Sequence, residues 1–193
     1  MNAGPLPSLA GARCALRPLS ETDADDVHLV FGDAEAMRYW DNVPAPTLAE
    51  TARRLGAFLS LPPLWAGAWH VRDQAGFIGC VFYHHREAWN RRLELGWIAL
   101  RARWGQGLMV EAVGAVLAHA FAPEAQGGMG ANRIELSGFT EAMRERLRAY
   151  GLFTEIISWK LRFFVPIGAA GPTVLAKLLD TYPVTRILDR EAA

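Results

Sequence analysis

Cysteine is scarce in this sequence, and neither sign of charge is in excess. The two cysteines, Cys14 and Cys80, are far apart and lack the close spacing of a zinc site, which argues against a disulfide scaffold or a thiolate metal module. Lys plus Arg and Asp plus Glu both number 20, so no net field draws the chain to nucleic acid or to an anionic membrane. We expect two buried thiols, no nucleic-acid or membrane partner, and a cytoplasmic location.

Long hydrophobic runs and a secretory start are also missing. No window approaches the roughly 18 uninterrupted apolar residues that a membrane-spanning helix needs. The start, MNAGPLPSLAG, lacks the basic segment followed by an apolar one that marks a secretory signal. Residues 1–10 contain Pro, Gly and Ser and are expected to form a loose leader. A chain of 193 residues is long enough for one substantial core, which predicts a single domain.

Hydrophobic periodicity changes along the chain and predicts the order of its elements. Helical spacing, period-two alternation and short connections indicate one strand, two helices, three antiparallel strands, a helix, a strand and a helix. They are expected over residues 13–19, 20–33, 46–61, 68–73, 76–85, 91–100, 108–121, 132–136 and 140–151. The sequence therefore predicts an α/β fold with a mixed, largely antiparallel sheet flanked by helices.

Two glycines stand at the start of the expected helix 108–121, in the stretch RWGQGLMVEAV. The first amides of a helix have no acceptor within the helix and carry partial positive charge, and glycines let an anion approach the backbone closely. The turn suits a pyrophosphate, although a tight turn or close packing would use the same residues. A P-loop is excluded because no Gly-Lys-Ser/Thr follows, and the antiparallel strand before the turn disfavours a dinucleotide-binding fold.

The element order, together with ELGWIALRARWGQGLMVEAV, resembles the Gcn5-related N-acetyltransferase superfamily, in particular its ribosomal-protein-alanine acetyltransferase branch. LRPLSETDADDV, GFIGCV and NRIEL resemble further strands and the first helix of that branch, and the likeness covers about residues 12–136. The resemblance implies an enzyme that binds acetyl-CoA as co-substrate and moves the acetyl group to an amine. A noncatalytic acyl-CoA-binding or protein-interaction module on the same fold is the alternative.

The resemblance also implies a cofactor site along the central strand and the glycine turn. Backbone amides from Gly105 to Met109 would bind the pyrophosphate, and the backbone of 98–100 would pair with the pantetheine arm. Thr140 stands where relatives carry an asparagine that contacts CoA. The implied cofactor-binding residues are Ile98, Ala99, Leu100, Trp104, Gly105, Gln106, Gly107, Leu108, Met109 and Thr140. Arg144, Arg146 and Arg148 would either meet the 3′-phosphate or form a solvated helix face.

Two carboxylates on central strands are candidates for the general base. Glu94 is the first choice, because it shares its strand with the expected cofactor contacts, and Glu135 is the second. A salt bridge from Glu94 to Arg91 or Arg92 would instead make it structural. Tyr150 is a weaker general-acid candidate, for which packing is the alternative.

Histidines and a tryptophan near the expected sheet are further candidate site residues. His84 and His85 are adjacent in one strand, so strict alternation would point them to opposite faces and prevent them from holding one metal. No metal is therefore expected. Trp40 would either shape the acceptor pocket or fill the core.

The C-terminal part, residues 154–193, departs from the pattern of the relatives. EIISWKLRFFVPIG predicts one long strand and GPTVLAKLLDTYP a helix, and the apolar run FFVPI favours an interface, either a substrate pocket or a homodimer contact. The acceptor is expected to be a small-molecule amine or a protein N-terminus.

Overall fold

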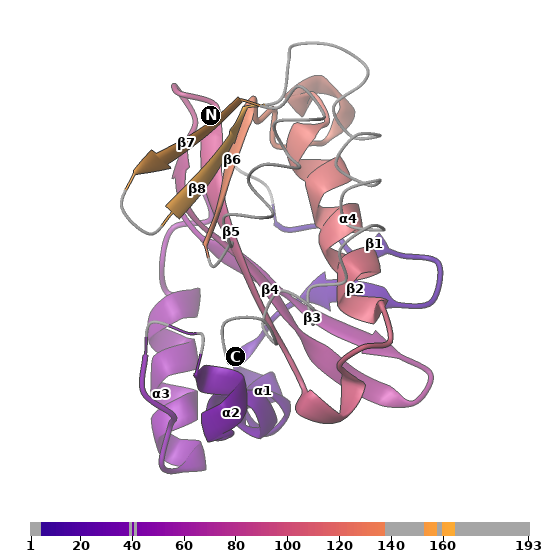
Figure 1. Cartoon of the computed structure of the whole chain (residues 1–193), viewed down its shortest axis with the longest axis vertical. Helices are drawn as coiled ribbons and strands as arrows, with labels where there is room; N and C mark the ends of the chain where they lie inside the picture. Colours follow the sequence, from indigo (N-terminus) through magenta and orange to yellow (C-terminus); the bar gives the residue numbers. More distant parts are fainter. Residues whose placement is uncertain (1–4, 39, 41, 138–152, 158–159, 165–193) are drawn as a thin grey trace.

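One eight-stranded sheet organises the computed structural model, which describes residues 5–38, 40, 42–137, 153–157 and 160–164 (Figure 1). The strand order is β1-β2-β3-β4-β5-β6-β8-β7, and β5 with β6 is the parallel pair among antiparallel ones. The strands are β1 (Leu9–Ala10), β2 (Ala15–Pro18), β3 (Gly67–Asp73), β4 (Gly76–Glu87), β5 (Arg92–Ala99), β6 (Arg133–Ser137), β7 (Phe153–Ile157) and β8 (Lys160–Phe164). The expected α/β fold with a mixed, largely antiparallel sheet is confirmed.

Helices cover both faces of this sheet and create two apolar cores. The described helices are η1 (Glu21–Asp23), α1 (Ala24–Phe31), α2 (Ala34–Met37), α3 (Leu48–Leu59), η2 (Arg101–Arg103), α4 (Leu108–Phe121) and η3 (Glu124–Gln126). On one face, α4 packs its Val113 and Val116 against strand residues such as Leu93 and Leu95. On the other, α1 and α3 pack against alternate strand residues such as Phe82. Period-two alternation in β4 and β5 therefore sorts their side chains between two different environments.

Local signals fix the ends of several elements. Thr47 caps α3, since its side-chain oxygen accepts a hydrogen bond from the N–H of Glu50 at 3.2 Å, as expected of a threonine before a helix. The tight turns at 74–75 and 88–91 join β3, β4 and β5, as the sequence predicted. Within the part of the chain that the structure describes, no helix is long and apolar enough to cross a membrane.

Two expectations about the chain ends were wrong. Residues 5–10 are not a loose leader, because β1 pairs with β2 and the carbonyl of Pro7 accepts a hydrogen bond from the indole of Trp69 at 2.8 Å. The stretch expected to be one long strand instead contains β7 and β8, which pair antiparallel with each other. Both elements are held by partners distant in sequence, which local patterns do not reveal.

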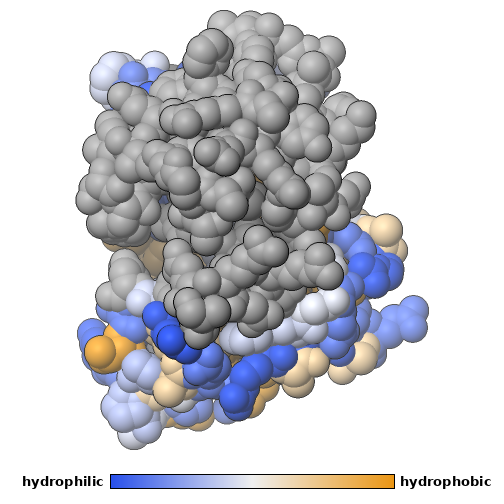
Figure 2. Space-filling model, in the orientation of Figure 1, coloured by the Kyte–Doolittle hydropathy of each residue, from blue (hydrophilic) through white to orange (hydrophobic). Residues whose placement is uncertain are grey.

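The described surface mixes polar and apolar residues. Figure 2 shows them interspersed in the lower part of its view, in keeping with the equal numbers of acidic and basic residues. The large apolar side chains that are exposed are Leu29, Val43, Leu48, Leu64, Trp65 and Trp89. Of these, Trp65 makes an edge-type ring contact with the imidazole of His85.

Gly79 lets β4 approach β5 closely at the end of β5. A Cβ at this position would lie 2.2 Å from the carbonyl oxygen of Ile98, closer than real atoms come. We expect Gly79→Ala to lower the free energy of unfolding by at least about 2 kcal/mol, measured by denaturant titration. Gly114→Ala is the matched control, because a Cβ there meets nothing within 4 Å. It is expected to stabilise the helix by about 0.5–1 kcal/mol, and equal effects of the two changes would contradict the close approach.

Candidate active site

The glycine turn adopts the conformation that only glycine takes easily. Gly105 and Gly107 both have φ of 74°, in the left-handed region, and Gly107 is the N-cap of α4. The helical ladder begins with the N–H of Glu111, which donates to the carbonyl of Gly107 at 3.2 Å. The amides of 108–110 therefore point out of the helix start, where the helix dipole favours an anion.

Arg13 holds this turn from the far end of the sequence. Its guanidinium donates to the carbonyl of Gln106 at 3.1 Å and forms an ion pair with Glu111 in the first turn of α4. Glu111 also accepts a hydrogen bond from the Arg13 backbone N–H at 2.9 Å. A positive charge, half exposed to solvent, therefore stands beside the expected pyrophosphate site. Sequence reasoning missed Arg13 as a site residue, since nothing in its local pattern shows a partner more than 90 residues away.

The strands β5 and β6 pair along only part of β5. Their described pairing runs from Arg92 to Leu95 on β5, whereas β4 follows β5 as far as Ala99. Beyond Leu95, the edge of β5 that faces β6 is therefore not used by any described strand. Such an edge can accept an extended ligand in the manner of an added strand.

Backbone direction decides which residues of β5 face this open edge. The N–H of Leu100 donates to the carbonyl of Ile78 at 2.8 Å, and the carbonyl of Ile98 points at Gly79 of β4. Because backbone groups alternate along a strand, Trp97 and Ala99 face the other way. Of Ile98, Ala99 and Leu100, Ala99 alone turns its backbone to the open edge, and Trp97 shares that direction. The expected pantetheine contacts stay predictions.

The side chains of Trp104 and Gln106 donate hydrogen bonds to backbone carbonyls near the turn. The indole N–H of Trp104 donates to the carbonyl of Ala99 at 2.9 Å, and the side-chain amide of Gln106 donates to the carbonyl of Ala102 at 3.1 Å. Leu108 and Met109 bury their side chains in the core while their amides lie at the helix start. These side chains shape the turn, and its backbone is left to meet a ligand.

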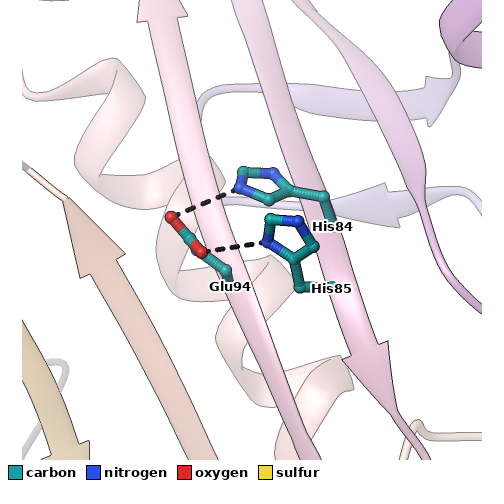
Figure 3. A group of neighbouring side chains, drawn as sticks. All are labelled: His84, His85 and Glu94. Atoms are coloured by element: carbon teal, nitrogen blue, oxygen red, sulfur yellow. Dashed lines mark hydrogen bonds and ion pairs between the residues drawn. The ribbon is translucent and has the colours of Figure 1, made fainter. Parts of the chain in front are cut away.

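Glu94 lies buried on β5 and is contacted by two histidines of β4 (Figure 3). Its carboxylate oxygens lie 3.3 Å from Nε2 of His84 and 3.3 Å from Nδ1 of His85. The Glu94 side chain is 5% exposed, against 34% for His84 and 51% for His85. The imidazoles therefore lie between the buried carboxylate and solvent.

The expectation that the two histidines point to opposite faces was wrong. The pairing of β4 with β5 is irregular between His84 and Glu87, and His85 has φ of 50°, which is rare for a residue other than glycine. This bulge turns His85 to the same side as its neighbour. The argument that the two histidines cannot bind one metal ion assumed strict alternation, and it therefore does not hold.

Glu135 is placed beside Glu94 but has different partners. The two residues are opposite each other on the parallel strands β5 and β6. Glu135 accepts a hydrogen bond from Arg92 at 2.9 Å, and Nε of Arg133 lies 3.5 Å away. The salt bridge considered for Glu94 thus occurs at Glu135, which acts as a counterion for two guanidiniums.

Arg92 has a second acidic partner in Glu87. The hydrogen bond from Arg92 lowers the pKa of Glu87 to about 2, helped by a bond from Asn90. The same bond raises the pKa of Arg92 above its usual value, and Glu135 adds to the effect. Arg92 therefore bridges Glu87 and Glu135.

Aromatic side chains line the same face of the sheet next to Glu94. Trp40 lies over Gly96, two residues after Glu94, where a Cβ would be 3.4 Å from the indole. Trp40 also lies 5.6 Å from Phe82 between ring centroids, and Phe31 and Phe58 complete the cluster. The core interpretation of Trp40 is therefore confirmed, and its role in shaping the acceptor pocket stays a prediction.

Comparison with known families decides the class of this site. The acetyltransferase (GNAT) domain matches residues 13–145, more than half of the chain. The chain belongs to the GNAT acetyltransferase family. It is therefore an acyltransferase, and its resemblance to the N-acetyltransferases is confirmed. An uncharacterised N-acetyltransferase from Bacillus subtilis, YoaA, is 25% identical over 138 residues, which cover 70% of this chain and 75% of the relative.

Solved structures share this GNAT fold. A putative acetyltransferase from T. thermophilus has a TM-score of 0.69 and 22% identity, with 91% of this chain and 97% of that one covered. Mycobacterium smegmatis RimJ, solved with a CoA disulfide, has a TM-score of 0.70 and 15% identity, with 92% and 97% covered. A spermidine N-acetyltransferase from Vibrio cholerae, solved with CoA and spermine, has a TM-score of 0.60 and 18% identity, with 79% and 93% covered.

The cysteines of this GNAT chain are buried, as expected. Burial raises the pKa of Cys80, and burial together with nearby Glu111 raises that of Cys14. Thiols that remain protonated at neutral pH are poor nucleophiles. Neither residue is suited to carry an acyl group.

Some expected GNAT site residues lie outside the described part of the chain. They are Thr140, Tyr150, Arg144, Arg146 and Arg148, together with the helix expected over 140–151 and the apolar run FFVPI beyond Phe164. Their predicted roles remain predictions.

Proposed function

We propose that this GNAT enzyme transfers an acetyl group from acetyl-CoA to a primary amine by direct attack within a ternary complex. One observation supports this most strongly. The open edge of β5, the left-handed glycine turn and the first amides of α4 follow one another along the chain, and Glu94 lies upstream on the same strand. The strand β5 thus carries a carboxylate and an edge for an extended ligand, and the turn that follows it carries an anion site.

Acetyl-CoA would lie along this strand end. Backbone amides of Gly105 to Met109 bind the pyrophosphate, and the charge of Arg13 lies nearby. Trp97 and Ala99 offer backbone groups to the pantetheine at the open edge. A backbone amide of the same strand would stabilise the oxyanion that develops on the thioester carbonyl.

Glu94 is the proposed general base. The amine nitrogen attacks the thioester carbon, the C–S bond breaks, and the sulfur leaves as CoA thiolate, which takes up a proton as free CoA. A protonated amine first gives one proton to solvent; after attack the nitrogen is cationic and gives one more proton to Glu94, directly or through water, and the product amide keeps its last N–H. The proton on Glu94 then passes to the CoA thiolate or to solvent, which restores the carboxylate. Glu135 is less suited, because protonating it would weaken its ion pairs with Arg92 and Arg133.

The acceptor is proposed to be either a small-molecule amine or a protein N-terminus. Related folds support both, since one is named a ribosomal L7/L12 alpha-N-protein acetyltransferase and another a spermidine N-acetyltransferase. The aromatic cluster around Trp40 borders Glu94 and would form one wall of the acceptor pocket.

The direct test measures free thiol released from acetyl-CoA in the presence of candidate amines. A panel that includes spermidine, free amino acids, an aminoglycoside and short peptides with unblocked N-termini is expected to contain at least one amine that accelerates release severalfold above hydrolysis. Mass spectrometry should find the acetylated product. Tight CoA binding with no turnover on any amine would instead favour the noncatalytic binding module.

A further inference from the structure

We infer that His84, His85 and Glu94 form a binding site for a divalent transition-metal ion such as Zn²⁺, and that its occupation inhibits acetyl transfer. The binding part stands on geometry alone. The inhibitory part rests on the proposed function, because it takes Glu94 as the general base.

The three side chains converge closely enough to share one ion. One ligand atom from each residue can be chosen so that all three lie within 4.8 Å of one another. The two contacts from imidazole nitrogen to carboxylate oxygen are 3.3 Å each. Ligand atoms around a tetrahedral Zn²⁺, at bonds of about 2.0–2.1 Å, lie about 3.3 Å apart. The two 3.3 Å contacts go to different oxygens of Glu94, so side-chain rotations would be needed to bring one atom of each residue to that spacing.

The backbone of β4 is distorted where it brings the histidines together. His85 takes φ of 50° at the irregularity between β4 and β5, a conformation that is strained for a residue with a side chain. Without it, alternation would send the imidazole of His85 to the opposite face, away from Glu94. The strained residue is thus the one whose position makes a three-ligand cluster.

The donor set selects the type of ion. Two imidazole nitrogens and a carboxylate are a common ligand set of zinc sites that keep a position open, whereas Mg²⁺ and Ca²⁺ prefer all-oxygen sites. Both imidazoles are partly exposed, so an ion could enter from solvent and keep water as a further ligand. The rings of Trp65 and His85 make an edge-type contact, with centroids 5.7 Å apart, which helps to orient His85.

Two described arginines near the cluster have acidic partners of their own. Arg92 and Arg133 lie on the same side of the sheet, but both contact Glu135, and Arg92 also pairs with Glu87. Their charges are thus offset by two carboxylates other than Glu94. An ion at the cluster would occupy a Glu94 oxygen and remove it from proton transfer, which explains how binding would inhibit the enzyme.

The first test titrates Zn²⁺ into the metal-free protein without acetyl-CoA, by isothermal calorimetry. One ion per chain is expected to bind the wild type, and His84→Asn or His85→Asn is expected to weaken the affinity at least about tenfold. His28→Asn is the control, because His28 contacts Thr51 on α3 and should leave binding unchanged. Absence of Zn²⁺ binding to the wild type would overturn the proposal, and so would His84→Asn and His85→Asn variants that bind Zn²⁺ as tightly as the wild type.

A second test does not depend on how well the variants fold. Co²⁺ bound to the wild-type protein should show the visible absorption of a four- or five-coordinate site, and Zn²⁺ should displace it; a spectrum of hydrated, six-coordinate Co²⁺ would count against the site.

A third test measures inhibition: Zn²⁺ should slow the release of free CoA thiol from acetyl-CoA, and a chelator should restore the rate. Zn²⁺ binding without any slowing would refute the inhibitory part of the proposal. Absence of thiol release from the metal-free enzyme would count against the proposed function only.

Discussion

Replacing Glu94 by glutamine is expected to lower kcat/KM for acetyl transfer by about 10²–10⁴-fold, the usual contribution of a general base. The amide keeps the size of the side chain and can still accept a hydrogen bond from either imidazole, so thermal unfolding and CoA affinity should change little. Raising the pH toward the pKa of the acceptor amine should restore part of the rate, since more of the amine is then already deprotonated. Steady-state thiol release across pH measures this.

Two other carboxylate variants make the result specific. Glu50→Gln, on the exposed side of α3, removes a carboxylate that pairs with Arg53 and Arg54 and should leave the rate within about twofold. Glu135→Gln removes one of the two acidic partners of Arg92 and should mainly lower the melting temperature. If Glu94→Gln kept the full kcat/KM and a folded Glu135→Gln lost most of it, Glu135 would be the general base instead of Glu94.

Gly105→Asp is expected to weaken CoA binding by at least about 100-fold, because it places a carboxylate beside the proposed pyrophosphate site. A side chain has room, since a Cβ at Gly105 meets nothing within 4 Å, so the fold should persist. Calorimetry with CoA measures the affinity, and circular dichroism checks the fold.

Strain and charge can be separated by two matched variants. Gly105→Asn introduces a side chain of similar size that tolerates positive φ and carries no charge, so it should cost much less affinity. Gly127→Asp introduces the same residue at φ of 79° in another open turn and should leave CoA binding unchanged. Unchanged affinity in Gly105→Asp would refute the pyrophosphate site.

The sequence predicted the parts of this fold that local patterns determine. Alternation in 68–100 predicted β3, β4 and β5, and the apolar stripe after Gly107 predicted α4 from its first residue. The glycine turn was predicted for the same reason, since positive φ and a following helix are local properties. The pairing of β1 and the presence of two strands, β7 and β8, where one long strand was expected were missed, because both depend on strand pairing that local patterns do not show.

The candidate site was predictable in its residue types but not in its partners. Glu94 and Glu135 were identified from their strands, but which of them meets Arg92 depends on side-chain direction across β5 and β6. Arg13 reaches the glycine turn through tertiary packing alone. The convergence of the two histidines could not be foreseen, because an irregular residue near the end of β4 leaves no mark on the hydrophobic pattern.

The two ends of β4 hold β5 in place, and this couples the chemistry to strand register. Gly79 fits closely against Ile98 at one end, and the bulge at His84 to Glu87 lies at the other. A slip of β5 by a single residue would exchange its two faces, so that Glu94 would enter the apolar core under α4 and Leu93 would take its place beside the histidines. Errors of sheet alignment would therefore abolish the base and the metal ligand together, even in a molecule that keeps its secondary structure.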